Sequence, residues 1–75
     1  MLHHATSPIH VPTLMIAGVQ DNIISPKAMF RSACAVPRAK TIFHQDGSHN
    51  VAHECRESVY NDILRFLEEV EEGLW

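Results

Sequence analysis

The stretch that decides the fold is residues 11–21, VPTLMIAGVQD. Its apolar run, Leu14–Ala17, does not alternate with polar residues, which favours a strand covered on both faces, although a buried helix has the same pattern. Pro12 stands where a strand can begin, and Gly18 ends the run and opens a loop. We therefore expect a buried strand followed by a loop that carries Asp21.

The following residues predict a helix and then a second strand. Ser25 and Pro26 are typical of a helix start, with serine as the N-cap and proline at the first helical position. Pro37 ends this helix because the residue before a proline disfavours the α conformation. The apolar stripe of the helix consists of Met29, Phe30, Ala33 and Cys34. Residues 40–44, KTIFH, are rich in strand-forming residues and predict the second strand.

The C-terminal segment has the clearest helical pattern. Apolar residues recur with the 3.6-residue period of a helix at Val59, Ile63, Phe66, Leu67, Val70 and Leu74. The opposite face carries Asp62, Arg65, Glu68, Glu69 and Glu72. We expect the apolar face to pack on the sheet; the alternative is an exposed amphipathic helix that docks to a partner.

The order strand, helix, strand, helix indicates the α/β class. Two strands joined through a helix are expected to pair in parallel, with a right-handed crossover. A parallel sheet needs helices on both faces, and two strands alone leave two open edges, so the pattern predicts one edge of a larger doubly wound sheet. Residues 1–10 are expected to form a flexible lead-in, and residues 11–75 a partial α/β domain.

Composition and charge narrow the functional classes. The chain is 45% hydrophobic and 20% charged, which is typical of a globular domain. Its net charge of −3 and its acidic C-terminal segment argue against a nucleic-acid partner. The longest apolar run is far shorter than the ~20 residues of a membrane span. No secretion signal is recognisable, so we expect a cytoplasmic chain whose two cysteines, Cys34 and Cys55, are free thiols.

Asp21 and His49 are the candidate functional residues. Each lies in the loop that follows one of the two expected strands. Because parallel strands place these loops at the same edge of the sheet, the two side chains are expected to meet. An aspartate that accepts the Nδ1–H of an imidazole sets its tautomer and leaves Nε2 free to act as a base.

Two neighbours of His49 are weaker candidates. Asp46 belongs to the same loop and is expected to make local turn hydrogen bonds. Ser48 directly precedes His49 and is not expected to act as a nucleophile, because adjacent residues rarely present their side chains to each other.

In these elements the chain resembles the C-terminal part of the α/β-hydrolase family. The matching segments are residues 11–21 (VPTLMIAGVQD), Ser25-Pro26, Gly47-Ser48-His49 and residues 63–67 (ILRFL). The resemblance covers nearly all of residues 9–70, and the 28 positions from Asp21 to His49 are similar to the family's spacing between triad acid and base.

This resemblance implies a specific fold and chemistry. The fold would be a β-α-β-α C-terminal fragment of an α/β-hydrolase parallel sheet. The function would be that of a serine hydrolase acting on small-molecule ester, amide or related carbonyl substrates without a cofactor. In its catalytic triad, Asp21 would be the acid and His49 the base, with Asn22 and Ser25 near the pocket.

The chain departs from the family at the nucleophile. The family carries its serine in a Gly-x-Ser-x-Gly motif, and this chain has glycines only at positions 18, 47 and 73. We therefore expect the 75-residue chain to be inactive alone. The alternative is a non-catalytic interaction module or truncated paralogue that self-associates, or complements another chain, through an uncovered sheet edge.

A metal site is the other alternative. His49 and His53 are spaced by four residues, as on one face of a helix, and Glu54, Cys55, His44 and Asp46 lie nearby. However, Asn50 stands where a helical metalloprotease carries its catalytic glutamate, and no Cys-x₂-Cys pair is present. We expect no metal in this site.

Overall fold

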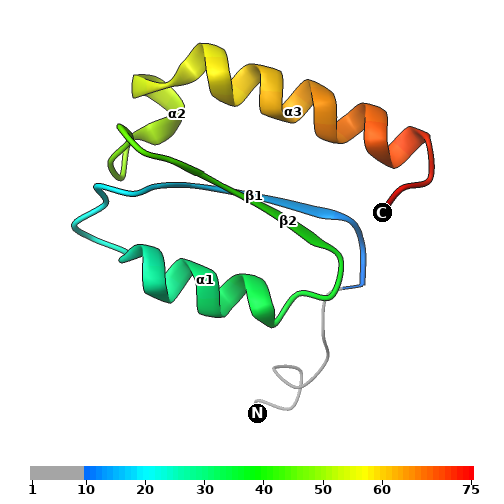
Figure 1. Ribbon diagram of the computed structural model, residues 1–75, viewed down its shortest axis with the longest axis horizontal. Coiled ribbons are helices and arrows are strands. Elements are labelled where there is room, and N and C mark those ends of the chain that lie inside the picture. Colours follow the sequence, from blue (N-terminus) through cyan, green and yellow to red (C-terminus); the bar gives the residue numbers. More distant parts are fainter. Residues whose placement is uncertain (1–9) are drawn as a thin grey trace.

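The computed structural model describes residues 10–75, and the elements follow the predicted order (Figure 1). They are β1 (Thr13–Gly18), α1 (Pro26–Cys34), β2 (Ala39–His44), α2 (Val51–Glu54) and α3 (Arg56–Glu71). The short helix α2 was not predicted. The expected lead-in falls on residues 1–9, outside the described residues, and on His10, which has no regular secondary structure.

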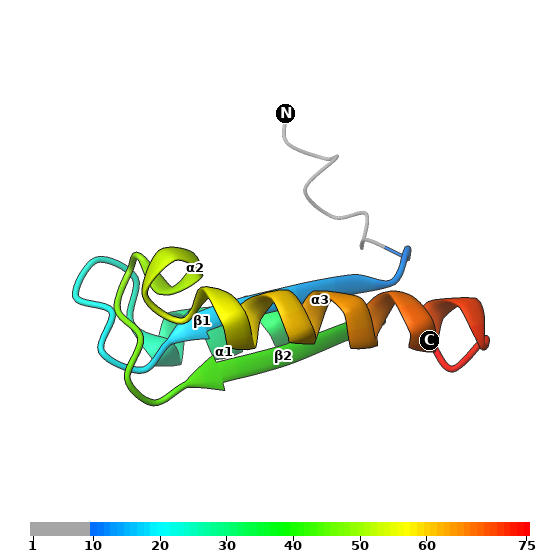
Figure 2. The same cartoon turned by 90° about the horizontal axis from the view of Figure 1, so that it is seen from above.

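The two strands pair in parallel, as the sequence predicts. Thr13 lies opposite Ala39 and Gly18 opposite His44, so both strands end at the same level. Helices α1 and α3 cover opposite faces of this sheet (Figure 1), and α3 lies over both strands when seen from above (Figure 2). In residues 10–75 the sheet has two strands, and the chain belongs to the α/β class.

Helix α1 begins as the sequence predicts. The Ser25 hydroxyl accepts a hydrogen bond from the backbone N–H of Ala28 at 3.1 Å, and Pro26 occupies the first helical position. The predicted apolar stripe is only half correct: Met29 and Ala33 are half-buried, whereas Phe30 and Cys34 are exposed. A helix on a two-stranded sheet covers a narrow surface, and Phe30 is turned about 100° around the axis from Met29.

Helix α3 is rotated relative to the prediction. Val59 and Phe66 are its buried residues, but the rest of the expected buried face (Ile63, Leu67, Val70 and Leu74) is exposed. Asp62 and Glu69, expected on the solvent face, turn toward β2 instead. There the Glu69 carboxylate forms an ion pair with Lys40 at 2.9 Å, and Asp62 contacts His44 at 2.7 Å.

The rotation has an electrostatic cause. Residues opposite each other in a parallel sheet share a face, so Leu14 and Ile16 of β1 face α3 together with Lys40 and Ile42 of β2. At its two ends the β2 part of this face carries Lys40 and His44, whose polar groups need partners, and α3 supplies the carboxylates of Glu69 and Asp62. None of the described helices is both long and apolar enough to cross a membrane.

Candidate functional site

The site lies where the two strands end, and a close approach of two glycines builds it. A methyl group at Gly18 would lie within 3.0 Å of backbone atoms of Gly47 and Ser48, so only glycine fits there. The backbone N–H of Gln20 donates to the Gly47 carbonyl at 2.8 Å. The loop after β1 is thereby attached to the loop after β2.

Asp21 is held in place by the turn that follows β1. Its Oδ1 accepts hydrogen bonds from the backbone N–H groups of Ile23 at 2.7 Å and Ile24 at 2.9 Å. Only 7% of its side chain is exposed. The N–H of Ile24 lowers the pKa of Asp21 most, and the N–H of Ile23 and the imidazole of His49 lower it further, against the opposing effect of burial. The carboxylate is therefore charged and oriented.

The predicted contact between Asp21 and His49 is confirmed. Asp21 Oδ2 lies 3.1 Å from His49 Nδ1. This geometry allows Nδ1–H to donate to the carboxylate, which leaves Nε2 unprotonated in the neutral ring. Within residues 10–75 no group is hydrogen-bonded to Nε2, and 51% of the His49 side chain is exposed. One nitrogen is thus buried against an anion, and the other is open to a proton donor.

Glu54 holds the loop that presents His49. Its Oε1 accepts two hydrogen bonds from Ser48, from the backbone N–H at 2.8 Å and from the hydroxyl at 2.7 Å. The Ser48 hydroxyl in turn accepts a bond from the N–H of Asn50 at 3.3 Å. The N–H of Ser48 is the main cause of the lowered pKa of Glu54, with its hydroxyl second. Because the Ser48 hydroxyl is bonded to Glu54, it is not directed at His49.

The sequence did not single out Glu54 for this role. Glu54 is the sixth residue after Ser48, and this spacing does not match a capping box or another local motif. The contact arises because helix α2 turns the chain back toward its own entry loop. The signal that the sequence offers is a glutamate five positions after His49.

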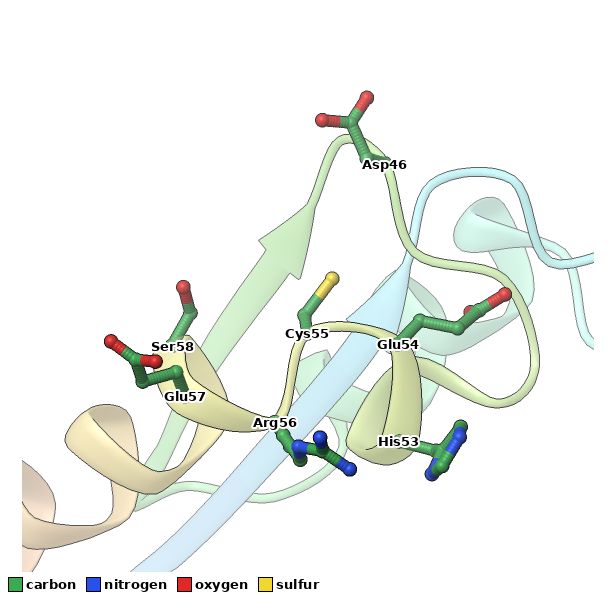
Figure 3. Close-up of a pocket in the computed structure, with 7 residues that line it drawn as sticks. All are labelled: Asp46, His53, Glu54, Cys55, Arg56, Glu57 and Ser58. Atoms are coloured by element: carbon green, nitrogen blue, oxygen red, sulfur yellow. The ribbon is translucent and has the colours of Figure 1, made fainter.

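Among the described residues, none of the remaining candidates is hydrogen-bonded to Asp21 or His49. Asp46 is exposed and lines an open hollow at the junction of α2 and α3 (Figure 3), which includes neither Asp21 nor His49. Asn22 is exposed, and the Ser25 hydroxyl is used as the cap of α1.

The residues of the metal alternative do not form a set of metal ligands. Glu54 is bonded to Ser48, and His44 contacts Asp62 rather than His49. Across the described residues, no three histidine, cysteine, aspartate or glutamate side chains gather in a metal-ligating arrangement. Cys34 and Cys55 are free thiols.

The His44–Asp62 contact is a second histidine–carboxylate pair that the sequence did not predict. It joins β2 to α3 at 2.7 Å through His44 Nε2, and both side chains are mostly buried. The two pairs differ in setting, because His44 lies under a helix whereas His49 is half exposed. Of the two pairs, Asp21–His49 is the one whose histidine side chain is half exposed to solvent.

No protein-family model matches the chain, and no curated protein and no solved structure matches it either. What the site can do therefore follows from its geometry and chemistry.

Proposed function

We propose that Asp21 and His49 are the acid and base of a serine hydrolase of the α/β-hydrolase type, which acts on ester, amide or related carbonyl substrates. The observation that carries this proposal is the 3.1 Å contact of Asp21 Oδ2 with His49 Nδ1, beside an Nε2 free of partners within residues 10–75. Its position supports the same function, because open α/β sheets bind ligands beyond the carboxyl ends of their strands.

The proposed mechanism uses each atom of the pair. Asp21 holds the tautomer in which Nδ1 of His49 carries the proton. Nε2 then accepts the proton of a serine hydroxyl as its oxygen attacks the substrate carbonyl, and later returns that proton to the leaving group. Asp21 stabilises the imidazolium that forms between these steps. Its lowered pKa keeps it ionised throughout the neutral pH range.

The serine nucleophile is not assigned to this chain. No serine of the sequence stands in a Gly-x-Ser-x-Gly motif. Ser25 and Ser48 are also engaged, since the first caps α1 and the second is bonded to Glu54. The proposal therefore gives this chain the acid and base, with the serine supplied by a segment outside these 75 residues.

The tautomer of His49 provides the direct test. Free imidazole side chains favour the Nε2–H form, so we expect ¹⁵N–¹H NMR of the chain to show predominantly Nδ1–H at His49. Asp21→Asn should reverse this preference. Asp46→Asn, in the same loop as His49, is the matched control and should leave the preference unchanged. An Nε2–H tautomer in the unmodified chain, or the same tautomer in Asp21→Asn, would contradict the proposal.

An esterase assay tests the assignment of the missing serine. An intact triad enzyme that loses one member keeps a rate roughly 10³–10⁴-fold above water, through its oxyanion hole and substrate binding. With neither a Gly-x-Ser-x-Gly motif nor its oxyanion hole in this sequence, we expect no efficient hydrolysis of a short activated ester by the 75-residue chain. Efficient turnover that both Asp21→Asn and His49→Ala abolish would show that the chain supplies its own nucleophile.

A second candidate function is a non-catalytic interaction module. It is favoured by the outer edge of β1, which is unpaired among the described residues, and by the exposed apolar side chains of α3. Under this function the open edge associates with another chain. Sedimentation that depends on concentration supports it, and a folded monomer at every concentration argues against it.

A further inference from the structure

One dipeptide in the loop after β2 has a reactivity that the proposed function does not use. Asp46 is followed by Gly47, whereas the other two aspartates of the chain, Asp21 and Asp62, are followed by residues that carry a side chain. The backbone nitrogen of the residue after an aspartate can attack the side-chain carboxyl carbon and close a five-membered ring. A side chain on that residue hinders the attack, and glycine has none. Asp46 is therefore the aspartate of this chain at which the attack is least hindered.

The carboxylate of Asp46 has no partner among the described residues. Asp46 is exposed, and its side chain projects from the tip of the loop, away from the other side chains labelled in Figure 3. The sequence predicted local turn hydrogen bonds for this residue, but within residues 10–75 its carboxylate forms none. In contrast, both carboxylate oxygens of Asp21 are hydrogen-bonded, and Asp62 contacts His44 from within α3.

The nitrogen of Gly47 becomes available when the loop opens. Its N–H donates to the His44 carbonyl at 3.1 Å, and its own carbonyl accepts a hydrogen bond from the N–H of Gln20 at 2.8 Å. Attack on Asp46 therefore requires a local opening that frees the Gly47 nitrogen from His44. Loops open in this way at a lower free energy than that of global unfolding. The fold thus slows the reaction at Asp46 without removing it.

We propose that Asp46 is a site of spontaneous isomerisation to isoaspartate, and that this conversion separates Asp21 from His49. The Gly47 nitrogen bonds to Cγ of the Asp46 carboxyl group, and one carboxyl oxygen leaves with two protons as water. Water then adds to the resulting succinimide at the former main-chain carbonyl of Asp46, and the bond from that carbon to the Gly47 nitrogen breaks. The main chain now runs through Cβ and Cγ, and the former main-chain carbonyl is a free carboxylate. Nothing is oxidised or reduced, and the mass of the chain is unchanged.

The isomerised chain does not fit the structure of the site. Isoaspartate adds one carbon atom to the main chain directly before Gly47. Gly47 lies so close to Gly18 that a methyl group on Gly18 would come within 3.0 Å of Gly47 backbone atoms. A longer main chain must therefore shift Gly47 away from Gly18, which breaks the hydrogen bond from Gln20. His49 follows Gly47 by two positions and moves with it, away from Asp21.

Ageing of the 75-residue chain at pH 7 and 37 °C tests the proposal. Digestion and fragmentation mass spectrometry measure isoaspartate at each aspartate, and ¹⁵N–¹H NMR of the same samples measures the His49 tautomer. We expect isoaspartate to accumulate at residue 46 before it appears at residues 21 and 62. The fraction of His49 that loses the Nδ1–H tautomer should equal the fraction of residue 46 that has converted. The Gln20 amide should exchange its hydrogen faster in the converted fraction, because its acceptor on Gly47 has moved.

Two variants of Asp46 separate this reaction from general ageing. Asp46→Glu is the matched control: it keeps the negative charge, but its extra methylene makes the ring six-membered, which closes far more slowly. The aged control should keep the Nδ1–H tautomer of His49 and the slow exchange of the Gln20 amide. Asp46→Asn closes the same five-membered ring faster, because its side chain is an un-ionised amide and ammonia leaves in place of water. When freshly prepared it should match the unmodified chain, and on ageing it should lose the tautomer sooner.

Three results would overturn the proposal. These are equal amounts of isoaspartate at residues 21, 46 and 62, conversion of residue 46 that leaves the exchange of the Gln20 amide unchanged, and an aged Asp46→Glu that loses the tautomer as fast as the unmodified chain. The proposal does not depend on the catalytic role of Asp21 and His49. If fresh protein lacks the Nδ1–H tautomer, the proposed function fails, whereas the isoaspartate content and the Gln20 exchange still decide this inference.

Discussion

Gly18→Ala tests the feature on which the site geometry depends. The added methyl group would lie within 3.0 Å of backbone atoms of Gly47 and Ser48, and these atoms cannot rotate away as a side-chain end can. One of the two loops must therefore move. Forced backbone shifts of this kind cost about 1–3 kcal/mol, against the roughly 3–5 kcal/mol that a domain of this size has available.

The same shift should separate Asp21 from His49. Asp21 follows Gly18 by three residues and His49 follows Gly47 by two, so displacing either loop lengthens the 3.1 Å contact. We expect urea denaturation to show a lower midpoint for Gly18→Ala, and NMR to show that the Nδ1–H tautomer of His49 is lost.

Gly73→Ala separates the loss of stability from the loss of the site. Gly73 has a φ of 76° and no neighbouring atoms within 4 Å of an added Cβ, so its replacement costs about 1–2 kcal/mol through backbone strain alone. The tautomer of His49 should survive this change. If Gly18→Ala keeps both the midpoint and the tautomer of the unmodified chain, the close approach of the two loops does not build the site.

Three further predictions follow from single contacts. The pKa of Asp21 in the folded state lies below its ordinary value of 3.8, so the stability that its carboxylate contributes is complete above pH 3.8 and is lost as the pH falls through the lowered pKa. Urea midpoints measured from pH 6 to pH 2 should therefore fall at the acidic end. The fall should be smaller in Asp21→Asn. Glu54→Gln removes the negative charge of the carboxylate that accepts both hydrogen bonds from Ser48. It should lower the urea midpoint and increase the rate of hydrogen exchange of the Ser48 amide. An unchanged exchange rate would contradict the role of Glu54 in holding the loop. Asp62→Asn replaces the carboxylate oxygen that contacts His44 Nε2 and should cost about 0.2–1 kcal/mol of stability, measured as a lower urea midpoint; an unchanged midpoint would show that this contact does not help to hold α3 on β2.

Local sequence determined the two strands, the two longer helices and their order. The apolar run after Pro12 and the Ser25-Pro26 pair act through neighbouring residues, and the structure confirms the strand and the helix that they predict. Chain topology then determined the meeting of Asp21 and His49, because two parallel strands must end at one edge of the sheet. These features depend on residue type and order, which a sequence shows directly.

Tertiary structure decided the rotation of α3 and the support of the His49 loop. The helical period was correct, but a period does not show which part of a broad apolar face meets the sheet. In the structure Glu69 contacts Lys40 and Asp62 contacts His44, and these two contacts turn that side of α3 toward β2. The bond from Ser48 to Glu54 likewise depends on how α2 turns the chain. The periodicity of apolar residues describes α3 by itself. The rotation of α3 about its axis depends on polar side chains of β2, and these contacts form only when the helix packs on the sheet.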